Sequence, residues 1–179
     1  TMTKDANLPV ETMWEGKYIV AKKQGTWEYV GRARGIEAAV ILAVDDAGCV
    51  LLVDQFRMPL GKRCLELPAG LIGDDVAGES AEIAAARELE EETGYRPGKI
   101  EPVGSFHSSP GMVSEGFTLM RATELVKTGE GGGVDGEDIT VHRVPLAEVE
   151  AFIAAKRAEG FAMDVKLLLL LGAGILAGR

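Results

Sequence analysis

The sequence has few cysteines, few histidines and few aromatic residues. Its 179 residues include two cysteines, two histidines and 6% aromatic residues. Cys49 and Cys64 are each followed by an apolar residue, and two cysteines alone argue against a disulfide framework and indicate core thiols in a reducing compartment, the cytoplasm. His107 and His142 lie in or beside expected strands without a matched partner, so we expect structural roles for both.

Positive charge is also scarce. Lysine and arginine total 19 against 28 aspartates and glutamates, which gives a formal net charge of -9. A surface of this charge repels polyanions and argues against general nucleic-acid binding or binding to anionic membranes. A protein with this charge that handles phosphates needs cations between its own acids and the substrate.

No apolar run is long enough to span a bilayer. The most apolar segment, 167–176, has about half of the ~20 residues that a spanning helix needs, and Lys166 and Arg179 flank it. We expect it to be a buried C-terminal helix. The segment from Thr1 to Pro9 lacks the apolar stretch of a signal peptide, so export is not expected.

The overall composition is that of one globular domain. The chain is 46% hydrophobic and 26% charged, at a length that one core supports. We expect an N-terminal strand arm over residues 1–36, built as a small β-hairpin, and one domain over residues 37–179. The order of elements predicts an α/β (α+β) fold, with a mixed β-sheet between helices.

Apolar patterning locates the expected elements. Strands are expected at 18–34 (a hairpin around Gly25), 38–44, 50–55, 64–67, 100–106 and 117–122. The strands at 38–44 and 50–55 flank a turn signal, so we expect them to pair. Helices are expected at 80–93, 146–159 and 164–176, with Ser80 beginning the first and Gly94 ending it. The acidic, glycine-rich segment 128–138 is expected to be a mobile loop.

The strongest chemical signal is a run of acids in the central helix. Gly73 and Glu79 precede the run Arg87-Glu88-Leu89-Glu90-Glu91-Glu92-Thr93-Gly94-Tyr95 at fixed spacings. At about 100° per residue, Glu88 and Glu92 lie roughly 40° apart around the helix axis, with Glu91 close by. Like charges at this spacing repel, and a hard divalent cation such as Mg²⁺ removes the repulsion. A solvated helix face is the ordinary alternative, but the fixed register with Gly94 and the preceding glycine loop favours the metal.

This run resembles the box of the Nudix hydrolase family, Gly-x5-Glu-x7-Arg-Glu-hydrophobic-x-Glu-Glu-x-Gly-hydrophobic. Every fixed position is matched when Gly73 opens the box. The resemblance implies a Nudix fold in which Glu88 and Glu92 hold Mg²⁺, or Mn²⁺ in its place. It also implies that Glu91 assists and that Glu79 and Arg87 support the metal ligands.

From about Gly16 onward the chain also resembles the ADP-ribose pyrophosphatase branch of that family. The segments that carry this resemblance are Gly25-Thr26-Trp27-Glu28, Asp54-Gln55-Phe56-Arg57-Met58-Pro59, Glu66-Leu67-Pro68-Ala69-Gly70, Ser109-Pro110-Gly111 and Gly136-Glu137-Asp138. In that branch the box glycine belongs to the Leu-Pro-Ala-Gly segment, which here stands three residues too early. Either Gly70 or Gly73 is therefore the structural glycine. The resemblance further implies the backbone carbonyl of Ala69 as a metal ligand.

The branch also implies a homodimer in which the arm of the second subunit completes each pocket. The implied substrate-binding residues are Tyr18, Trp27, Glu28, Arg32, Arg57 and Glu115. The two aromatic rings suit stacking on a purine, and Glu28 suits the adenine amino group. The two arginines match phosphate oxygens, although each can instead form an ion pair. Glu115 is implied near the terminal ribose.

The expected reaction is metal-dependent hydrolysis of ADP-ribose to AMP and ribose 5-phosphate. A metal-bound water is the expected nucleophile, and Glu137 in the glycine-rich loop is the expected general base, brought to the metals by loop closure. A solvated acidic loop is the alternative for Glu137. Two other functions stay open: hydrolysis of another nucleoside diphosphate sugar such as GDP-mannose, and nucleotide binding by a catalytically silent Nudix regulator. Trp27-Glu28 favours adenine, and the intact run from Arg87 to Gly94 favours catalysis.

Overall fold

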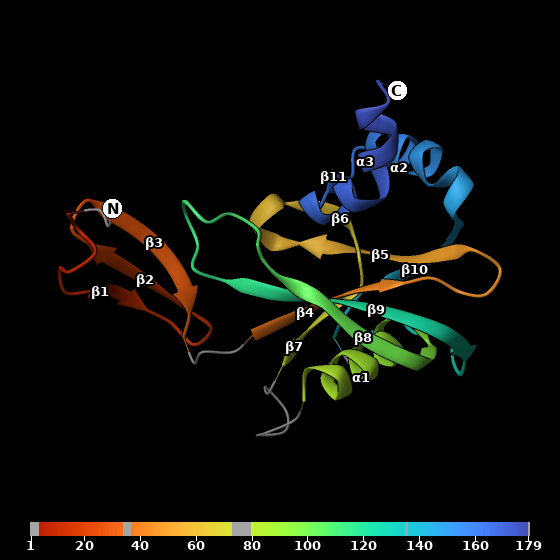
Figure 1. Ribbon diagram of the computed structural model, residues 1–179, viewed down its shortest axis with the longest axis horizontal. Coiled ribbons are helices and arrows are strands. Elements are labelled where there is room, and N and C mark those ends of the chain that lie inside the picture. Colours follow the sequence, from red (N-terminus) through yellow and green to blue (C-terminus); the bar gives the residue numbers. More distant parts are fainter. Residues whose placement is uncertain (1–3, 34–36, 73–79, 135, 179) are drawn as a thin grey trace.

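The computed structural model describes residues 4–33, 37–72, 80–134 and 136–178. These residues form three β-sheets and three α-helices (Figure 1). The N-terminal sheet has the order β1-β2-β3, with β1 Glu11–Glu15, β2 Ile19–Gln24 and β3 Trp27–Arg32. The second sheet has the order β7-β4-β9-β8, with β7 Ala69–Ile72, β4 Glu37–Ala43, β9 Gly116–Lys127 and β8 Tyr95–His107. The third sheet has the order β10-β5-β6-β11, with β10 Thr140–Pro145, β5 Cys49–Arg57, β6 Lys62–Glu66 and β11 Ala162–Met163.

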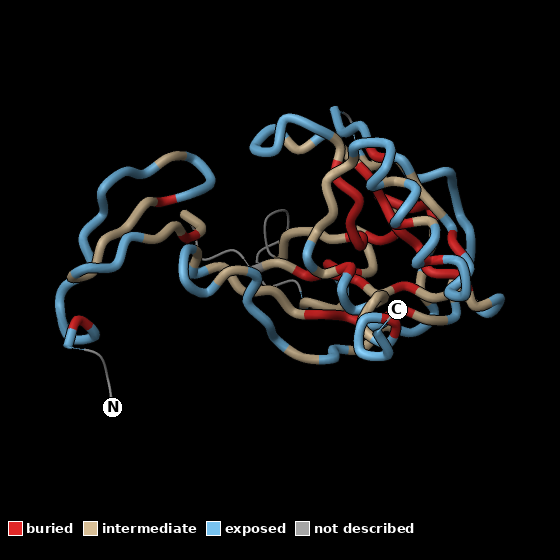
Figure 2. Tube along the Cα trace, turned by 90° about the horizontal axis from the view of Figure 1, so that it is seen from above, coloured by how far each residue is buried: buried red, intermediate tan, exposed pale blue. Residues whose placement is uncertain are grey.

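The N-terminal sheet stands apart from the other two sheets and forms an arm (Figure 1). The expected hairpin is present, with β2 paired to β3 around Gly25 at φ 60°. A third strand, β1, adds to this hairpin and was not predicted. Every residue of β1 is exposed. A strand without a buried face lacks the alternation of apolar and polar residues by which strands are predicted from sequence. Val20 is the buried hydrophobic residue of this sheet, and Figure 2 shows how little of the arm is buried.

The expected pairing of 38–44 with 50–55 is wrong. The chain makes only an isolated bridge between Val44 and Val50 beyond the turn, and then β4 and β5 enter different sheets. β4 lies between β7 and β9, while β5 lies between β10 and β6. Each strand is apolar on both faces because each is central in its own sheet. The turn signal between two strands therefore does not predict with which strands each of them pairs.

Helices cover the two central sheets on their outer sides, as the expected fold requires (Figure 1). Helix α1, Ala81–Thr93, packs Ala85 and Leu89 against Ile41 and Met120 of the second sheet. A second cluster lies between the sheets and the C-terminal helices, where Ile153 packs with strand residues that face away from α1. The C-terminal helices are α2, Val149–Ala158, and α3, Leu168–Leu176, preceded by the 3-10 helices Leu146–Glu148 and Val165–Leu167. A further 3-10 helix, Met58–Leu60, follows β5.

The C-terminal helix is less buried than expected. Leu167 before it and Gly174 within it are buried, but Leu168, Leu169 and Leu176 are exposed. The expectation of a buried helix is therefore wrong for the outer face of α3, because this helix packs on the molecule along one side. Among the helices that the structure describes, none has the length and apolar character to cross a membrane.

Candidate active site

A cleft of about 780 Å³ lies where α1, β7 and the loop after β9 meet. Nine of the residues predicted from the sequence line it: Arg32, Arg57, Ala69, Arg87, Glu88, Glu91, Glu92, Glu115 and Glu137. Helix α1 supplies the acidic wall. Its side chains are fixed in register because Ser80 Oγ accepts the Ile83 N–H at the first turn, and Gly94 adopts a left-handed conformation (φ 73°) at the last.

Glu92 is the most deeply buried acid of this wall. Its residue exposure is 5%, and its Oε2 accepts a hydrogen bond from the Ala69 N–H at 3.1 Å. Burial raises the pKa of Glu92 to about 8, and the nearby charges of Glu88 and Glu137 add to the effect. A carboxylate held in this way favours either a proton or a cation as its partner.

Glu88 stands beside Glu92 and against the backbone of β7. A β-carbon added at Gly70 would lie 2.0 Å from Glu88 Cγ and 2.6 Å from its Oε2, so only glycine leaves room for this carboxylate. Burial raises the pKa of Glu88, Arg87 opposes the shift, and Glu91 contributes to it. Glycine is thus required at position 70 because the Glu88 side chain approaches the backbone closely. Gly73 and Glu79 lie outside the described residues.

Arg87 and Glu91 form the charged edge of the acidic wall. Arg87 Nη1 lies 3.1 Å from Glu88 Oε1 and 3.1 Å from Glu91 Oε2. This geometry agrees with the expectation that Arg87 orients acids of the box. Because the arginine partly neutralises both carboxylates, the strongest uncompensated negative charge of the wall is left at Glu92 and the inner side of Glu88.

The segment 128–138 approaches the same helix. It has no helix or strand in its described residues, as expected, but its backbone is bonded to the end of α1. Gly132 N donates to Glu92 O at 2.8 Å, and Gly133 N donates to Glu91 O at 3.1 Å. Glu137 follows in this loop and lines the cleft, with its Oε2 accepting the Val134 N–H at 3.0 Å.

Both predicted phosphate-binding arginines are engaged in ion pairs. Arg57 Nε and Nη2 donate to the two oxygens of the Glu66 carboxylate at 2.6 and 2.8 Å. Arg32 Nε donates to Glu115 Oε1 at 2.5 Å. Arg57 nevertheless lines the cleft with 42% of its side chain exposed, and the pairing with the buried Glu66 fixes the plane of the guanidinium.

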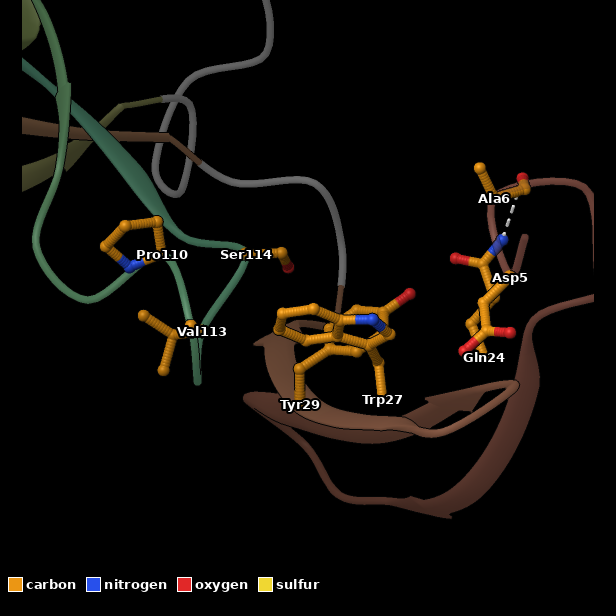
Figure 3. A pocket seen from close by; sticks show the side chains of 9 residues that line it. Asp5, Ala6, Gln24, Trp27, Tyr29, Pro110, Val113 and Ser114 are labelled. Carbon is orange, nitrogen blue, oxygen red and sulfur yellow. Dashed lines mark hydrogen bonds between the residues drawn. The ribbon is translucent and has the colours of Figure 1, made fainter. Parts of the chain in front are cut away.

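The predicted base-binding residues of the arm are outside this cleft. Trp27 lines a separate pocket of about 370 Å³ between the arm and the β8–β9 loop, where Tyr29, Pro110 and Val113 surround it (Figure 3). Tyr18 is 58% exposed with Lys17 Nζ over its ring, and Glu28 is exposed. The single chain therefore does not bring Tyr18, Trp27 and Glu28 together with the acids of α1.

Several residues of the cleft were not predicted from the sequence. Glu66, Phe117, Asp164 and Lys166 all line it. The sequence could have indicated Glu66 as a site residue, because it is an acid at the otherwise apolar end of a strand. Asp164 accepts the Lys166 N–H at 2.8 Å, so in sequence it has the pattern of an ordinary helix cap.

The expectation that His142 lacks a matched partner is wrong. Its Nε2 lies 2.5 Å from Oδ2 of Asp54, a buried residue of β5. His107 has a local contact, with Nδ1 3.3 Å from Glu115 O. Both cysteines are free and buried, as expected for core thiols.

The donor set of the cleft fits a hard divalent cation. Carboxylate and carbonyl oxygens are the ligands that Mg²⁺ accepts, and it completes its shell with water and substrate phosphate. Within the described ranges, no three acidic, histidine or cysteine side chains form a metal-binding group by themselves. The fit therefore rests on Glu88, Glu92 and the neighbouring Ala69 backbone, where burial of negative charge is otherwise costly.

Comparisons with known proteins identify the family. The NUDIX domain profile matches residues 34–164, and the chain belongs to the Nudix hydrolase family. It is 36% identical over 120 residues to the ADP-ribose pyrophosphatase of Bacillus subtilis (strain 168), an alignment that covers 66% of this chain and 63% of that protein. It is also 36% identical over 147 residues to the GDP-mannose pyrophosphatase of Cronobacter sakazakii, covering 77% of this chain and 72% of that protein.

A solved structure is similar over nearly the whole chain. The crystal structure of an ADP compounds hydrolase superposes with a TM-score of 0.69 and covers 96% of this chain and 94% of its own, at 22% identity. This likeness confirms the fold predicted from the sequence. The family match likewise confirms the resemblance to the Nudix family that was drawn from the sequence.

Proposed function

We propose that this enzyme hydrolyses the diphosphate bond of ADP-ribose and releases AMP and ribose 5-phosphate. The observation that carries the proposal is that Glu88, Glu91, Glu92 and Glu137 line one cleft together with Arg57. An acidic wall repels a diphosphate unless cations lie between the two, and the arginine supplies a fork that matches phosphate oxygens. The name of the Bacillus subtilis relative supports ADP-ribose as the substrate.

In this proposal, Glu88, Glu92 and the Ala69 carbonyl hold Mg²⁺, with Mn²⁺ as the alternative. The bound cation supplies neutralisation of the diphosphate and a water of lowered pKa. Arg87 and Glu91 keep the Glu88 carboxylate turned toward the cleft, because Arg87 lies 3.1 Å from both acids. Gly70 leaves the space that this carboxylate fills.

Glu137 is the proposed general base. Its carboxylate lies in the cleft close enough to Glu88 and Glu92 for its charge to raise the pKa of both. On the arrival of substrate, Glu137 exchanges its bond to the Val134 N–H for the proton of the attacking water. Arg57 binds the departing phosphate and holds the diphosphate in line for attack.

We further propose a homodimer, with residues 1–36 as a swapped arm on the domain 37–179. In this arrangement Tyr18, Trp27 and Glu28 are proposed to bind adenine in the partner's cleft. Three observations support this: the three residues are outside the cleft of their own chain, Trp27 and Tyr18 are each at least half exposed, and β1 has no buried residue. Large apolar side chains exposed in this way are expected to be covered by a second chain. Arg32 and Glu115 line the cleft, and we propose that Arg32 binds phosphate oxygens and Glu115 the terminal ribose.

Product analysis with and without metal tests the reaction. We expect ADP-ribose to yield AMP and ribose 5-phosphate, chelation to abolish turnover, and added Mg²⁺ to restore it. Tight binding of ADP-ribose without turnover in excess Mg²⁺ would instead identify a nucleotide-binding regulator. The silent regulator is disfavoured because Glu88, Glu91 and Glu92 of the box line the cleft together.

A second candidate is hydrolysis of GDP-mannose, favoured by the relative from Cronobacter sakazakii. Both substrates share the diphosphate, so the α1 wall serves either one. The difference lies in the base and the sugar. A kcat/KM for GDP-mannose far above that for ADP-ribose would reverse the choice of substrate and leave the cleft chemistry unchanged.

A further inference from the structure

Arg63 of β6 ties the general-base loop to the third sheet. Its Nη1 donates to the Asp138 carboxylate at 2.7 Å, and its Nη2 donates to the Asp138 carbonyl at 3.1 Å and to Thr140 Oγ1 at 3.0 Å. Its Nε donates to Oδ1 of Asp54, and Nη2 also donates to Asp54 O at 2.9 Å. Two of these contacts are made to Asp138, the residue after Glu137, and one to Thr140, the first residue of β10.

Asp54, the partner of Arg63 on β5, is itself held in place. Asp54 is 2% exposed on the central strand β5, and its second carboxylate oxygen lies 2.5 Å from His142 Nε2 on β10. Three neighbouring strands therefore hold the guanidinium in one plane. A lysine at position 63 would keep the charge but not the fork of donors that reaches both Asp54 and Asp138.

The same loop is attached on its other side to helix α1. The Gly132 and Gly133 amides bond to the Glu92 and Glu91 carbonyls, as described above. Glu137 thus lies in a short span between an attachment to the metal-binding helix and an attachment to Arg63. These two attachments indicate that the loop is held in place. Its glycine content had instead predicted a loop that closes.

We propose that Arg63 is a positioning residue that holds Glu137 at the reacting end of the cleft. The proposal rests on Glu137 being the general base, as proposed above. Arg63 is not among the described residues that line the cleft, so it acts through Asp138 and not through contact with substrate. Its removal should displace the base and leave substrate affinity unchanged.

The test is a double-mutant cycle of Arg63→Gln with Glu137→Gln, measured as kcat and KM for ADP-ribose in saturating Mg²⁺. Because small misplacements of a catalytic group cost up to about 100-fold, we expect Arg63→Gln to lower kcat by about 10-fold or more in the wild-type chain. In the Glu137→Gln background the same substitution should change kcat by less than about 2-fold, because a positioning residue has no effect once the base is gone. KM should change little in either background.

Two further variants separate positioning from general loss of structure. Asp138→Ala removes the carboxylate partner of Arg63 at a side chain that is 82% exposed, so we expect a smaller loss of kcat in a fully folded protein. Arg143→Gln breaks a comparable pair on β10, with Asp45 at 2.6 Å. It should leave kcat unchanged, because this pair joins β10 to the turn before β5 and, unlike Arg63, is not bonded to the residue after Glu137.

The outcomes distinguish the two proposals. If Glu137→Gln keeps wild-type turnover, the general base is wrongly assigned and the role of Arg63 is lost with it. If Glu137→Gln loses turnover while Arg63→Gln has no effect, or lowers kcat equally in both backgrounds, only the positioning role of Arg63 is overturned. Non-additive loss with unchanged KM supports it.

Discussion

The backbone of Gly70 lies against the side chain of Glu88. The position that a β-carbon would take at residue 70 is 2.0 Å from Glu88 Cγ and 2.2 Å from Glu88 Cδ. The requirement for glycine here comes from the approach of a carboxylate and not from a left-handed backbone, since Gly70 is not among the glycines of positive φ. Strand β7 and helix α1 are therefore matched at this contact, and the orientation of Glu88 depends on it.

Gly70→Ala should displace the Glu88 carboxylate and lower kcat by about 100-fold, since the metal ligands must hold their geometry closely. Gly172→Ala is the matched control. It adds the same methyl group to α3, where nothing lies within 4 Å of the new atom, and alanine favours a helix. Steady-state kinetics and a thermal melt of both variants check the prediction. Wild-type kcat in Gly70→Ala would contradict the structural role given to Gly70.

Glu92→Gln should abolish turnover and leave the fold intact. Changes to outer-shell partners of a metal already cost about 10–100-fold, so loss of a direct ligand should lower kcat by more than about 100-fold. The amide keeps the size of the side chain and an oxygen that can accept the Ala69 N–H. Circular dichroism and kcat measured on the same preparation check both parts. Retained activity would refute Glu92 as a metal ligand.

The same substitution should change how stability depends on pH in the metal-free protein. An unfolded glutamate ionises near pH 4.5, whereas burial raises the pKa of folded Glu92 to about 8. The folded chain therefore binds more protons between these values, and its free energy of unfolding falls as the pH rises from about 4.5 to 8. Glu92→Gln should remove this fall and be more stable than the wild type at pH 9, by an amount on the order of 3 kcal/mol. Urea unfolding in chelator at pH 5 and pH 9 measures the difference, and equal slopes with pH would contradict it.

Arg57 and Glu66 should respond differently to mutation. Arg57→Ala leaves the Glu66 carboxylate buried without its partner, so we expect a loss of about 2 kcal/mol in stability, moderated because Arg57 is 42% exposed. It should also raise KM by about 10-fold or more, because a charged hydrogen bond to phosphate is lost. Glu66→Gln keeps the arginine in the cleft and should cost less in both measurements. A larger effect of Glu66→Gln on KM would mean that Arg57 does not contact substrate.

The parts of the site that follow local rules could be predicted from the sequence. Ser80, Gly94 and the acids between them define one helix because capping and side-chain spacing depend on neighbours in the chain. The separation of β4 and β5 into two sheets could not be predicted, since strand pairing is decided by contacts far along the sequence. The Arg63–Asp138 contact joins residues 75 positions apart and has no local pattern. The two attachments of the Glu137 loop were missed for the same reason, because glycine content alone indicates only mobility.

The position of Trp27 leads to the last prediction. In its own chain this ring lies in the pocket of Figure 3, away from the α1 acids, and in the proposed exchange of arms it serves the partner's cleft. Trp27→Ala should raise KM for ADP-ribose by about 10-fold or more, because a base that stacks on an aromatic ring contributes about 1–3 kcal/mol.

A heterodimer of two defective chains tests the exchange of arms directly. One chain carries Trp27→Ala, the other carries Glu92→Gln, and two affinity tags isolate the mixed dimer. If the arms are exchanged, one of its two sites combines the intact Trp27 of one chain with the intact Glu92 of the other, and the dimer should show about half of the wild-type activity. If each arm serves its own chain, no site is intact and the mixed dimer should be no more active than the mean of the two mutant homodimers. A chain that is monomeric at assay concentration would exclude the exchange altogether, because Trp27 would then have no second cleft to enter.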